Sequence, residues 1–168
     1  MVRGLKGALV REFEGRLIGK GFRFAVVVAR FNEFATRKLL EGALEGLRAH
    51  GTYEDDIAVA WVPGSLELGV AATIIAKSRK YSAVICLGAV IRGETGHYDV
   101  VATQSTKAIS RIALETGVPI ITGILTTENS RQAVDRAGGK AGNKGYDAAL
   151  SAIEMVNLIA LLKEESSS

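Results

Sequence analysis

The sequence predicts a three-layer α/β sandwich, in which helices cover both faces of a four-stranded parallel sheet. Short, continuously apolar runs alternate along the chain with longer segments whose apolar residues recur at helical spacing. Strands that alternate with helices in this way are joined by right-handed crossovers and form a parallel sheet. The chain has 168 residues, of which 48% are hydrophobic, so we expect residues 1–168 to form one domain with its own core.

The first half of the chain contains two strand–helix units. Residues 22–29, FRFAVVVA, are continuously apolar, as in a strand buried on both faces. A helix follows, and we expect Thr36 to cap it. Residues 57–62 are the second strand, which ends at Pro63-Gly64, and residues 66–78 are the second helix. The apolar residues of the first helix recur at helical spacing: Leu39, Leu40, Ala43, Leu44 and Leu47.

The second half of the chain continues the alternation. We expect strands at residues 82–91 and 118–126, with a helix over residues 98–117 between them. A short helix around residues 129–137 and a long helix around residues 145–163 follow.

The two ends of the chain are less regular. We expect residues 1–21 to form either an edge strand or an arm that reaches another subunit, and residues 164–168 to form a frayed tail. We find no internal repeat and no low-complexity linker in the sequence.

The composition argues against several classes of function. Lys and Arg total 21 and Asp and Glu 18, a net charge of +3, and no basic run marks a nucleic-acid-binding arm. The N-terminus lacks the apolar core of a signal peptide, and we expect no segment apolar enough to span a bilayer. Cys86 is the single cysteine, and His50 and His97 are the only histidines, so we expect neither a disulfide nor a metal site. We therefore expect a protein of the cytoplasm, or of the plastid stroma after removal of a transit peptide, with no nucleic-acid or membrane partner.

Four loops are predicted to meet at one edge of the sheet. Ligands of open parallel sheets bind outside the carboxyl ends of the strands. Phe31 lies in the first of these loops, although a simple turn would use Gly, Asn, Asp or Ser. The ring either stacks on a flat ligand or packs on a neighbouring element or subunit. The loops comprise residues 30–32, 63–65, 92–97 and 126–127.

Two of these loops lead directly into helices. His97 ends a glycine-rich loop, and a histidine can transfer protons near neutral pH. The alternative is a helix-terminal histidine that bonds to the backbone. Residues 64–67 and 92–95 provide unpaired helix-start N–H groups that suit carbonyls, hydroxyls or an anion. The alternative is a simple turn in which Ser65 is a cap.

Residues 135–145, DRAGGKAGNKG, are the most unusual stretch. Arg136, Lys140 and Lys144 lie among four glycines. Such cations can hold a phosphate, and glycine permits close approach of the backbone. The alternative is a helix–helix turn with solvated cations. The stretch is not a P-loop, because the Gly-Lys-Ser/Thr pattern is absent and a helix precedes it.

Four motifs in order resemble those of the lumazine synthase family: RFNEF, VPGSLEL, GAVIRGETGHYD and GILTTENSRQAVDRAGGKAGNKGYDAALSAIEM. The likeness implies a flavodoxin-like sheet and a transferase of riboflavin biosynthesis. Family members condense 5-amino-6-(D-ribitylamino)uracil with 3,4-dihydroxy-2-butanone 4-phosphate to 6,7-dimethyl-8-ribityllumazine, and phosphate and water leave. The resemblance implies no metal and no organic cofactor.

The resemblance also implies a role for each site residue. Phe31 matches the aromatic residue that stacks on the pyrimidine ring. His97 matches the proton-transfer histidine, and Asp147 matches an acidic residue near it. Arg136 matches a phosphate-binding arginine that the neighbouring subunit delivers. The other substrate-binding positions are Asn32, Ser65, Leu66, Glu67, Ala89, Val90, Ile91, Thr122 and Lys144, and the other phosphate-binding positions are Gly93, Glu94 and Thr95.

The resemblance extends to assembly. Family sites lie between adjacent subunits of a pentamer, and in many members twelve pentamers form a hollow icosahedral capsid. The compact turn before residue 145, which has no insertion, favours the capsid over a free pentamer. Riboflavin synthase is then a candidate partner inside the shell.

Three residues depart from the family's pattern. Thr122 stands where members commonly have a phenylalanine near the substrate of the adjacent subunit, which puts affinity in doubt. Gly69 replaces a proline, and Gly139 replaces a frequent threonine.

Other functions stay open at this point. A binding module of the same fold would hold flavin or lumazine without turnover, and Thr122 is its support. A structural shell around a partner enzyme is compatible with catalysis. A flavodoxin-like electron carrier fits less well, because residues 30–32 occupy the place of its phosphate loop.

Overall fold

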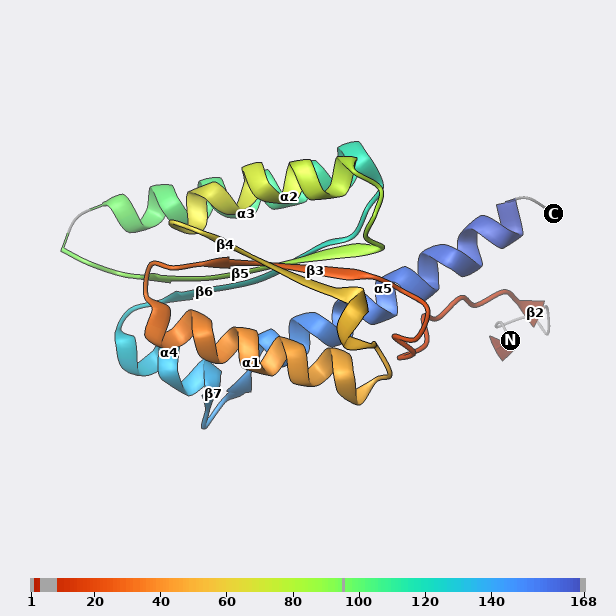
Figure 1. Cartoon of the computed structure of the whole chain (residues 1–168), viewed down its shortest axis with the longest axis horizontal. Helices are drawn as coiled ribbons and strands as arrows, with labels where there is room; N and C mark the ends of the chain where they lie inside the picture. Colours follow the sequence, from red (N-terminus) through yellow and green to blue (C-terminus); the bar gives the residue numbers. More distant parts are fainter. Residues whose placement is uncertain (1, 4–8, 95, 167–168) are drawn as a thin grey trace.

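The computed structural model describes residues 2–3, 9–94 and 96–166, and it confirms the predicted three-layer α/β fold (Figure 1). Four parallel strands form the central sheet in the order β4-β3-β5-β6. Helices α2 and α3 cover one face of the sheet, and α1, α4 and α5 cover the other (Figure 1). The strands are β3 (Phe24–Ala29), β4 (Ile57–Val62), β5 (Ala83–Ile91) and β6 (Ile120–Thr127).

The helices follow the strands as the sequence predicts. A 3-10 turn, η2 (Ser65–Glu67), leads into α2, and a second one, η1 (Glu54–Asp56), leads into β4. A two-stranded hairpin, β7 (Ala137–Gly139) and β8 (Gly142–Asn143), joins α4 to α5. The α-helices are α1 (Glu33–Ala49), α2 (Leu68–Lys77), α3 (His97–Thr116), α4 (Ser130–Arg136) and α5 (Lys144–Ser166).

The core lies on both faces of the sheet because the two central strands are covered on both sides. All six residues of β3 are buried. Side chains alternate across a strand, so Phe24 and Val26 pack in the cluster under α1 and α5, whereas Ala25 and Val27 pack in the cluster under α2 and α3. Cys86 belongs to the second cluster, and burial raises the pKa of its thiol to about 12, so it packs as a small apolar residue.

Helix α1 begins earlier than the sequence predicts. Asn32 occupies the N-cap position with a left-handed backbone (φ 60°), and its carbonyl accepts hydrogen bonds from the N–H groups of Ala35 and Thr36. The prediction that Thr36 caps this helix is therefore wrong. Thr36 is buried in the first turn, and its hydroxyl has no hydrogen-bond partner among the described residues.

The N-terminal segment does not join the central sheet in the residues that the structure describes. The short strands β1 (Val2–Arg3) and β2 (Leu9–Val10) pair with each other, so the edge-strand alternative is wrong for them. The segment that follows contacts α5, where the Asn157 amide donates to the Ile18 carbonyl at 2.9 Å. An arm that reaches another subunit stays a prediction.

Helix α5 differs from expectation in two ways. It continues through Ser166, so residues 164–166 are helical rather than frayed. It is also long and apolar enough to cross a membrane by length and composition, so the expectation of no such segment is wrong. The same helix buries Ala149, Ala152 and Ile153 in the core beneath the sheet, as the core helix of a globular protein does.

Candidate active site

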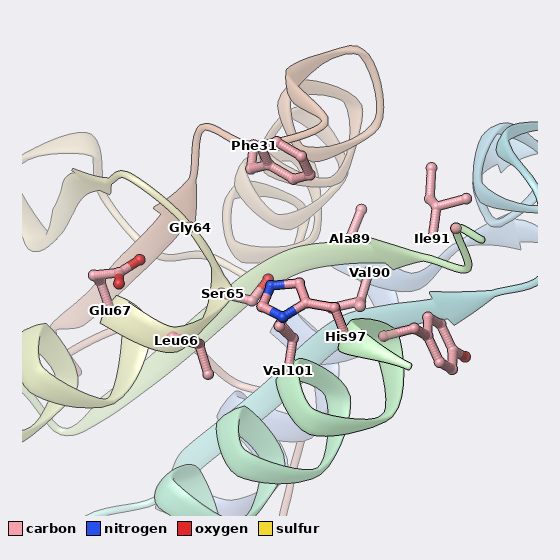
Figure 2. A pocket seen from close by; sticks show the side chains of 12 residues that line it. Phe31, Gly64, Ser65, Leu66, Glu67, Ala89, Val90, Ile91, His97 and Val101 are labelled. Carbon is pink, nitrogen blue, oxygen red and sulfur yellow. The ribbon is translucent and has the colours of Figure 1, made fainter. Parts of the chain in front are cut away.

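A pocket of about 380 Å³ lies at the carboxyl ends of β3, β4 and β5, where the sequence places the candidate loops. Figure 2 shows the side chains that line it, with Phe31 and His97 on different walls and the end of β5 between them in the view. The lining residues are Phe31, Gly64, Ser65, Leu66, Glu67, Ala89, Val90, Ile91, Gly93, His97, Tyr98 and Val101.

Phe31 presents its ring to the pocket from a fixed backbone. The N–H groups of Arg30 and Phe31 donate to the carbonyls of Val62 and Pro63, at 2.8 and 3.0 Å, which ties this loop to the end of β4. The residue is nevertheless 72% exposed. An aromatic side chain that is held at a pocket but left uncovered is suited to stacking on a planar ligand.

Asn32 ties the same loop to the end of the neighbouring strand β5. Its side-chain amide donates to the carbonyl of Ala89 at 2.8 Å. Asn32 does not line the pocket in the part of the chain described, and its side chain contacts the Ala89 carbonyl instead. The direct role in substrate binding that the resemblance implies for it stays a prediction.

Residues 64–67 supply the second wall. Gly64 is the N-cap of η2 with extended backbone, and Ser65 is the first residue of the turn and makes no capping hydrogen bond, contrary to the simple-turn alternative. Ser65 is buried against β5, where a Cβ on Gly88 would lie 2.7 Å from its hydroxyl oxygen. Leu66 and Glu67 are exposed, so this wall combines a hydroxyl, an apolar side chain and a carboxylate.

The end of β5 offers its backbone to the pocket. Its pairing with β3 ends at Val28 opposite Leu87, whereas its pairing with β6 continues to Ile91 opposite Thr127. Residues 89–91 therefore have a strand neighbour on one side only. Backbone groups beyond the end of a ladder need other partners, and this arrangement favours the predicted backbone contacts to a ligand ring.

His97 is the first residue of α3 and is exposed at the edge of the pocket. Tyr98 and Val101 line the pocket beside it, and the sequence analysis missed both, whereas Gly64 belongs to a loop that it named. Val101 could have been found from helical spacing, because residues four apart lie on the same face of a helix. Gly93 also lines the pocket, whereas Glu94 is exposed outside it, and Thr95 lies outside the described residues.

Besides Asn32 and Glu94, four predicted residues do not reach this pocket in the described chain. Arg136 ends α4 and is exposed, and its guanidinium donates to the Gln132 carbonyl at 3.3 Å. Lys144 and Asp147 pair with each other at 2.7 Å on the first turn of α5. Thr122 is exposed on β6. The roles predicted for all four stay predictions.

The glycine-rich stretch forms the β7–β8 hairpin and the start of α5. A Cβ on Gly145 would lie 1.9 Å from the Leu39 carbonyl oxygen, so only glycine permits this approach of α5 to α1. Asn143 caps α5 by accepting from the Gly145 N–H at 2.9 Å, and its amide donates to the Lys38 carbonyl at 2.8 Å. These contacts favour the structural alternative for Gly145 and Asn143.

The described residues contain no group of three His, Cys, Asp or Glu side chains that could hold a metal ion. The pocket combines an aromatic face, hydroxyl and carboxylate groups, free backbone and an imidazole. Such a set can orient a planar polar molecule and transfer protons to and from it.

One comparison with known proteins identifies a family. A family model described as 6,7-dimethyl-8-ribityllumazine synthase matches residues 21–160 of the 168-residue chain. The matched region contains the central sheet, every residue that lines the pocket and the glycine-rich stretch.

Proposed function

Since the chain belongs to the 6,7-dimethyl-8-ribityllumazine synthase family, and is thus a transferase of riboflavin biosynthesis, we propose that it catalyses the condensation predicted from its motifs. The substrates are 5-amino-6-(D-ribitylamino)uracil and 3,4-dihydroxy-2-butanone 4-phosphate, and the products are 6,7-dimethyl-8-ribityllumazine, phosphate and water. The observation that carries this proposal is that an exposed aromatic ring, a wall with a hydroxyl and a carboxylate, and a histidine line one pocket.

The pyrimidine substrate occupies the pocket described above. Its ring stacks on Phe31, an interaction worth about 1–3 kcal/mol in nucleic-acid systems. Its carbonyl and N–H groups meet the edge of residues 89–91 that β3 does not cover, beside the Ala89 carbonyl that already accepts from Asn32. Its ribityl hydroxyls lie along residues 65–67, where the exposed Glu67 carboxylate accepts hydrogen bonds.

The second substrate lies toward α3. The 5-amino group of the pyrimidine attacks the ketone, and one water leaves as the imine forms. A proton is then lost from the neighbouring carbon, the bond from carbon to the phosphate oxygen breaks, and phosphate leaves. The ribitylamino nitrogen closes the second ring on the remaining carbonyl, and a second water leaves. His97 transfers protons in these steps, a contribution of roughly 10²–10⁴-fold for general acid–base catalysis. Holding both substrates together contributes more, about 7–11 kcal/mol for well-oriented reactants.

The site is completed by a neighbouring copy of the chain. Phe31 is largely uncovered, and Arg136, Lys144 and Thr122 lie outside the pocket of their own chain. We infer a homo-oligomer, with the pentamer as the basic unit, in which Arg136 of one subunit binds the phosphate at the pocket of the next.

The reaction is tested by turnover. The purified protein is mixed with the two substrates, and the lumazine product is followed by absorbance and fluorescence after subtraction of the uncatalysed rate. Acceleration supports the reaction and shows that Thr122 is tolerated. A protein that binds riboflavin but gives no acceleration is a binding module, the second function, which Thr122 favours.

The shared site is tested by co-expression of two inactive variants. His97→Ala and Arg136→Ala subunits form some sites with both residues intact if the two residues come from different chains. Activity above the sum of the two variants is then expected. The matched control is His97→Ala with Phe31→Ala, because these residues line one pocket and no mixed site is intact. Equal recovery in both mixtures contradicts a site between subunits.

A further inference from the structure

Arg92 is the centre of a charged cluster beside the pocket. It follows β5 directly, and its guanidinium nitrogens donate to both oxygens of Asp99, each at 3.4 Å. Its Nε lies 2.8 Å from a carboxylate oxygen of Glu128. The guanidinium carbon lies 4.1 Å from the centroid of the Tyr98 ring. These hydrogen bonds to Asp99 and Glu128 raise the pKa of Arg92, which therefore stays charged.

The partners of Arg92 come from separate elements. Tyr98 and Asp99 lie in the first turn of α3, and Glu128 follows β6. The N–H of Arg92 also donates to the carbonyl of Thr127 at 2.8 Å. One side chain thus joins the end of β5 to the end of β6 and to the start of the helix that carries His97.

Gly93 and Gly96 lie between these anchor points and contribute no side chain that could hold the start of α3. A Cβ built on Gly93 or Gly96 meets no heavy atom within 4 Å among the described residues. Gly96, the N-cap of α3, makes no side-chain cap. The first turn of α3 therefore depends on the contacts of its own side chains, and those of Tyr98 and Asp99 go to Arg92.

We propose that Arg92 is a positioning residue for the reaction: it holds Tyr98 and Asp99 and so fixes the His97 imidazole at the edge of the pocket. This inference rests on the proposed function. Arginine suits the task because its planar group binds a carboxylate with two hydrogen bonds and stacks on a ring at the same time, which lysine cannot do. Arg92 does not bind the substrate phosphate, because two carboxylates already neutralise it and it does not line the pocket.

The test compares four variants in the intact protein. Arg92→Gln removes the charge, Arg92→Lys keeps the charge without the planar group, and Asp99→Asn removes one partner. The matched control is Arg111→Gln, which breaks the Arg111–Glu115 pair on the same helix, outside the pocket. The measurements are kcat, the KM for the butanone phosphate, and amide hydrogen exchange over residues 97–104.

A positioning role predicts losses in kcat rather than in KM. We expect Arg92→Gln to lower kcat about 10-fold, because small misplacements of catalytic groups are costly, with the KM changed less than about 3-fold. Arg92→Lys recovers part of the loss, and Asp99→Asn lowers kcat in the same direction. Exchange over residues 97–104 becomes faster in Arg92→Gln and Asp99→Asn but not in Arg111→Gln.

The opposite pattern overturns the inference. If Arg92 binds the phosphate, Arg92→Gln raises the KM with little effect on kcat, and Asp99→Asn lowers the KM because it frees the guanidinium. Unchanged kcat in Arg92→Gln also overturns it. If the wild-type protein shows no turnover, the proposed function has failed, and the exchange comparison alone decides whether Arg92 holds the turn.

Discussion

The pocket loops and the glycine-rich hairpin use their unusual residues in different ways. In the pocket loops the unusual residues act through their side chains: Phe31 and His97 are exposed toward a shared space, and the backbone N–H groups of Arg30 and Phe31 are hydrogen-bonded. In the hairpin and the first turn of α5, which follows it, they serve packing and links between helices. Gly145 admits the Leu39 carbonyl, Asn143 links α5 to α1, and the cations around them are exposed.

This difference shows that an unusual sequence motif can indicate either ligand binding or close packing. A side chain left exposed at the end of a buried strand has no part in the core, so its presence indicates a ligand. A glycine with no room for a Cβ indicates packing, even between cations that suggest a phosphate site. We therefore expect substitutions in the pocket to change activity and substitutions in the hairpin to change stability.

The largest effect is expected from Gly145→Ala. Its Cβ would lie 1.9 Å from a backbone oxygen of α1, so the two helices must move apart. Overpacking typically costs about 1–3 kcal/mol, and we expect the upper end because backbone cannot rotate away. The free energy of unfolding is measured by urea titration at fixed protein concentration. Gly93→Ala is the control, since nothing described lies within 4 Å of its Cβ. Equal stability of the two variants removes the packing role of Gly145.

His97→Ala is expected to act on turnover alone. Loss of general acid–base catalysis lowers kcat by roughly 100-fold, which corresponds to about 2.7 kcal/mol. Because His97 is exposed, the free energy of unfolding changes by less than about 0.5 kcal/mol. His50→Ala is the control, because His50 lies at the end of α1 and outside the pocket. A kcat that does not fall in His97→Ala excludes this residue from the mechanism.

Phe31→Ala tests whether the exposed ring in the pocket binds the pyrimidine substrate. Loss of stacking weakens binding of the pyrimidine substrate by about 1–3 kcal/mol, so its KM rises about 5-fold or more while kcat changes little. Steady-state kinetics with the pyrimidine varied measures this. Phe34→Ala is the matched control, since Phe34 is also exposed but does not line the pocket. Equal rises in KM for the two variants contradict specific stacking.

The sequence predicted what depends on local pattern. The alternation of apolar runs and helical spacing predicted the layers and the four strands, and the loops after three of those strands line one pocket. The predicted N-cap of α1 was wrong because the true N-cap depends on a contact with a distant part of the chain. Asn32 accepts a left-handed backbone while its amide bonds to Ala89, far along the chain, and a pattern search instead favours Thr36.

The same reason explains what the site prediction missed. The partners of Arg92 lie on α3 and in the segment after β6, and no spacing in the sequence places Glu128 beside Asp99. Likewise, the sequence around residue 145 is equally compatible with phosphate binding and with a tight turn. Only the close contact of Gly145 with α1 shows that packing requires a glycine there. Sequence pattern identifies side chains that face a ligand more readily than those that hold other side chains.

The smallest effect is expected from Asn143→Ala, which tests whether the hairpin acts through its links as well as its packing. The variant loses the N-cap of α5, worth about 0.5–2 kcal/mol, and the amide bond to Lys38. We expect a loss of about 1 kcal/mol in the free energy of unfolding with kcat and KM unchanged. Asn143→Asp retains the capping oxygen but not the amide donor. The decrease in its free energy of unfolding therefore measures the hydrogen bond to α1 separately from the cap. If Asn143→Ala instead lowers turnover without lowering stability, the hairpin belongs to the catalytic site, and the division between the two regions fails.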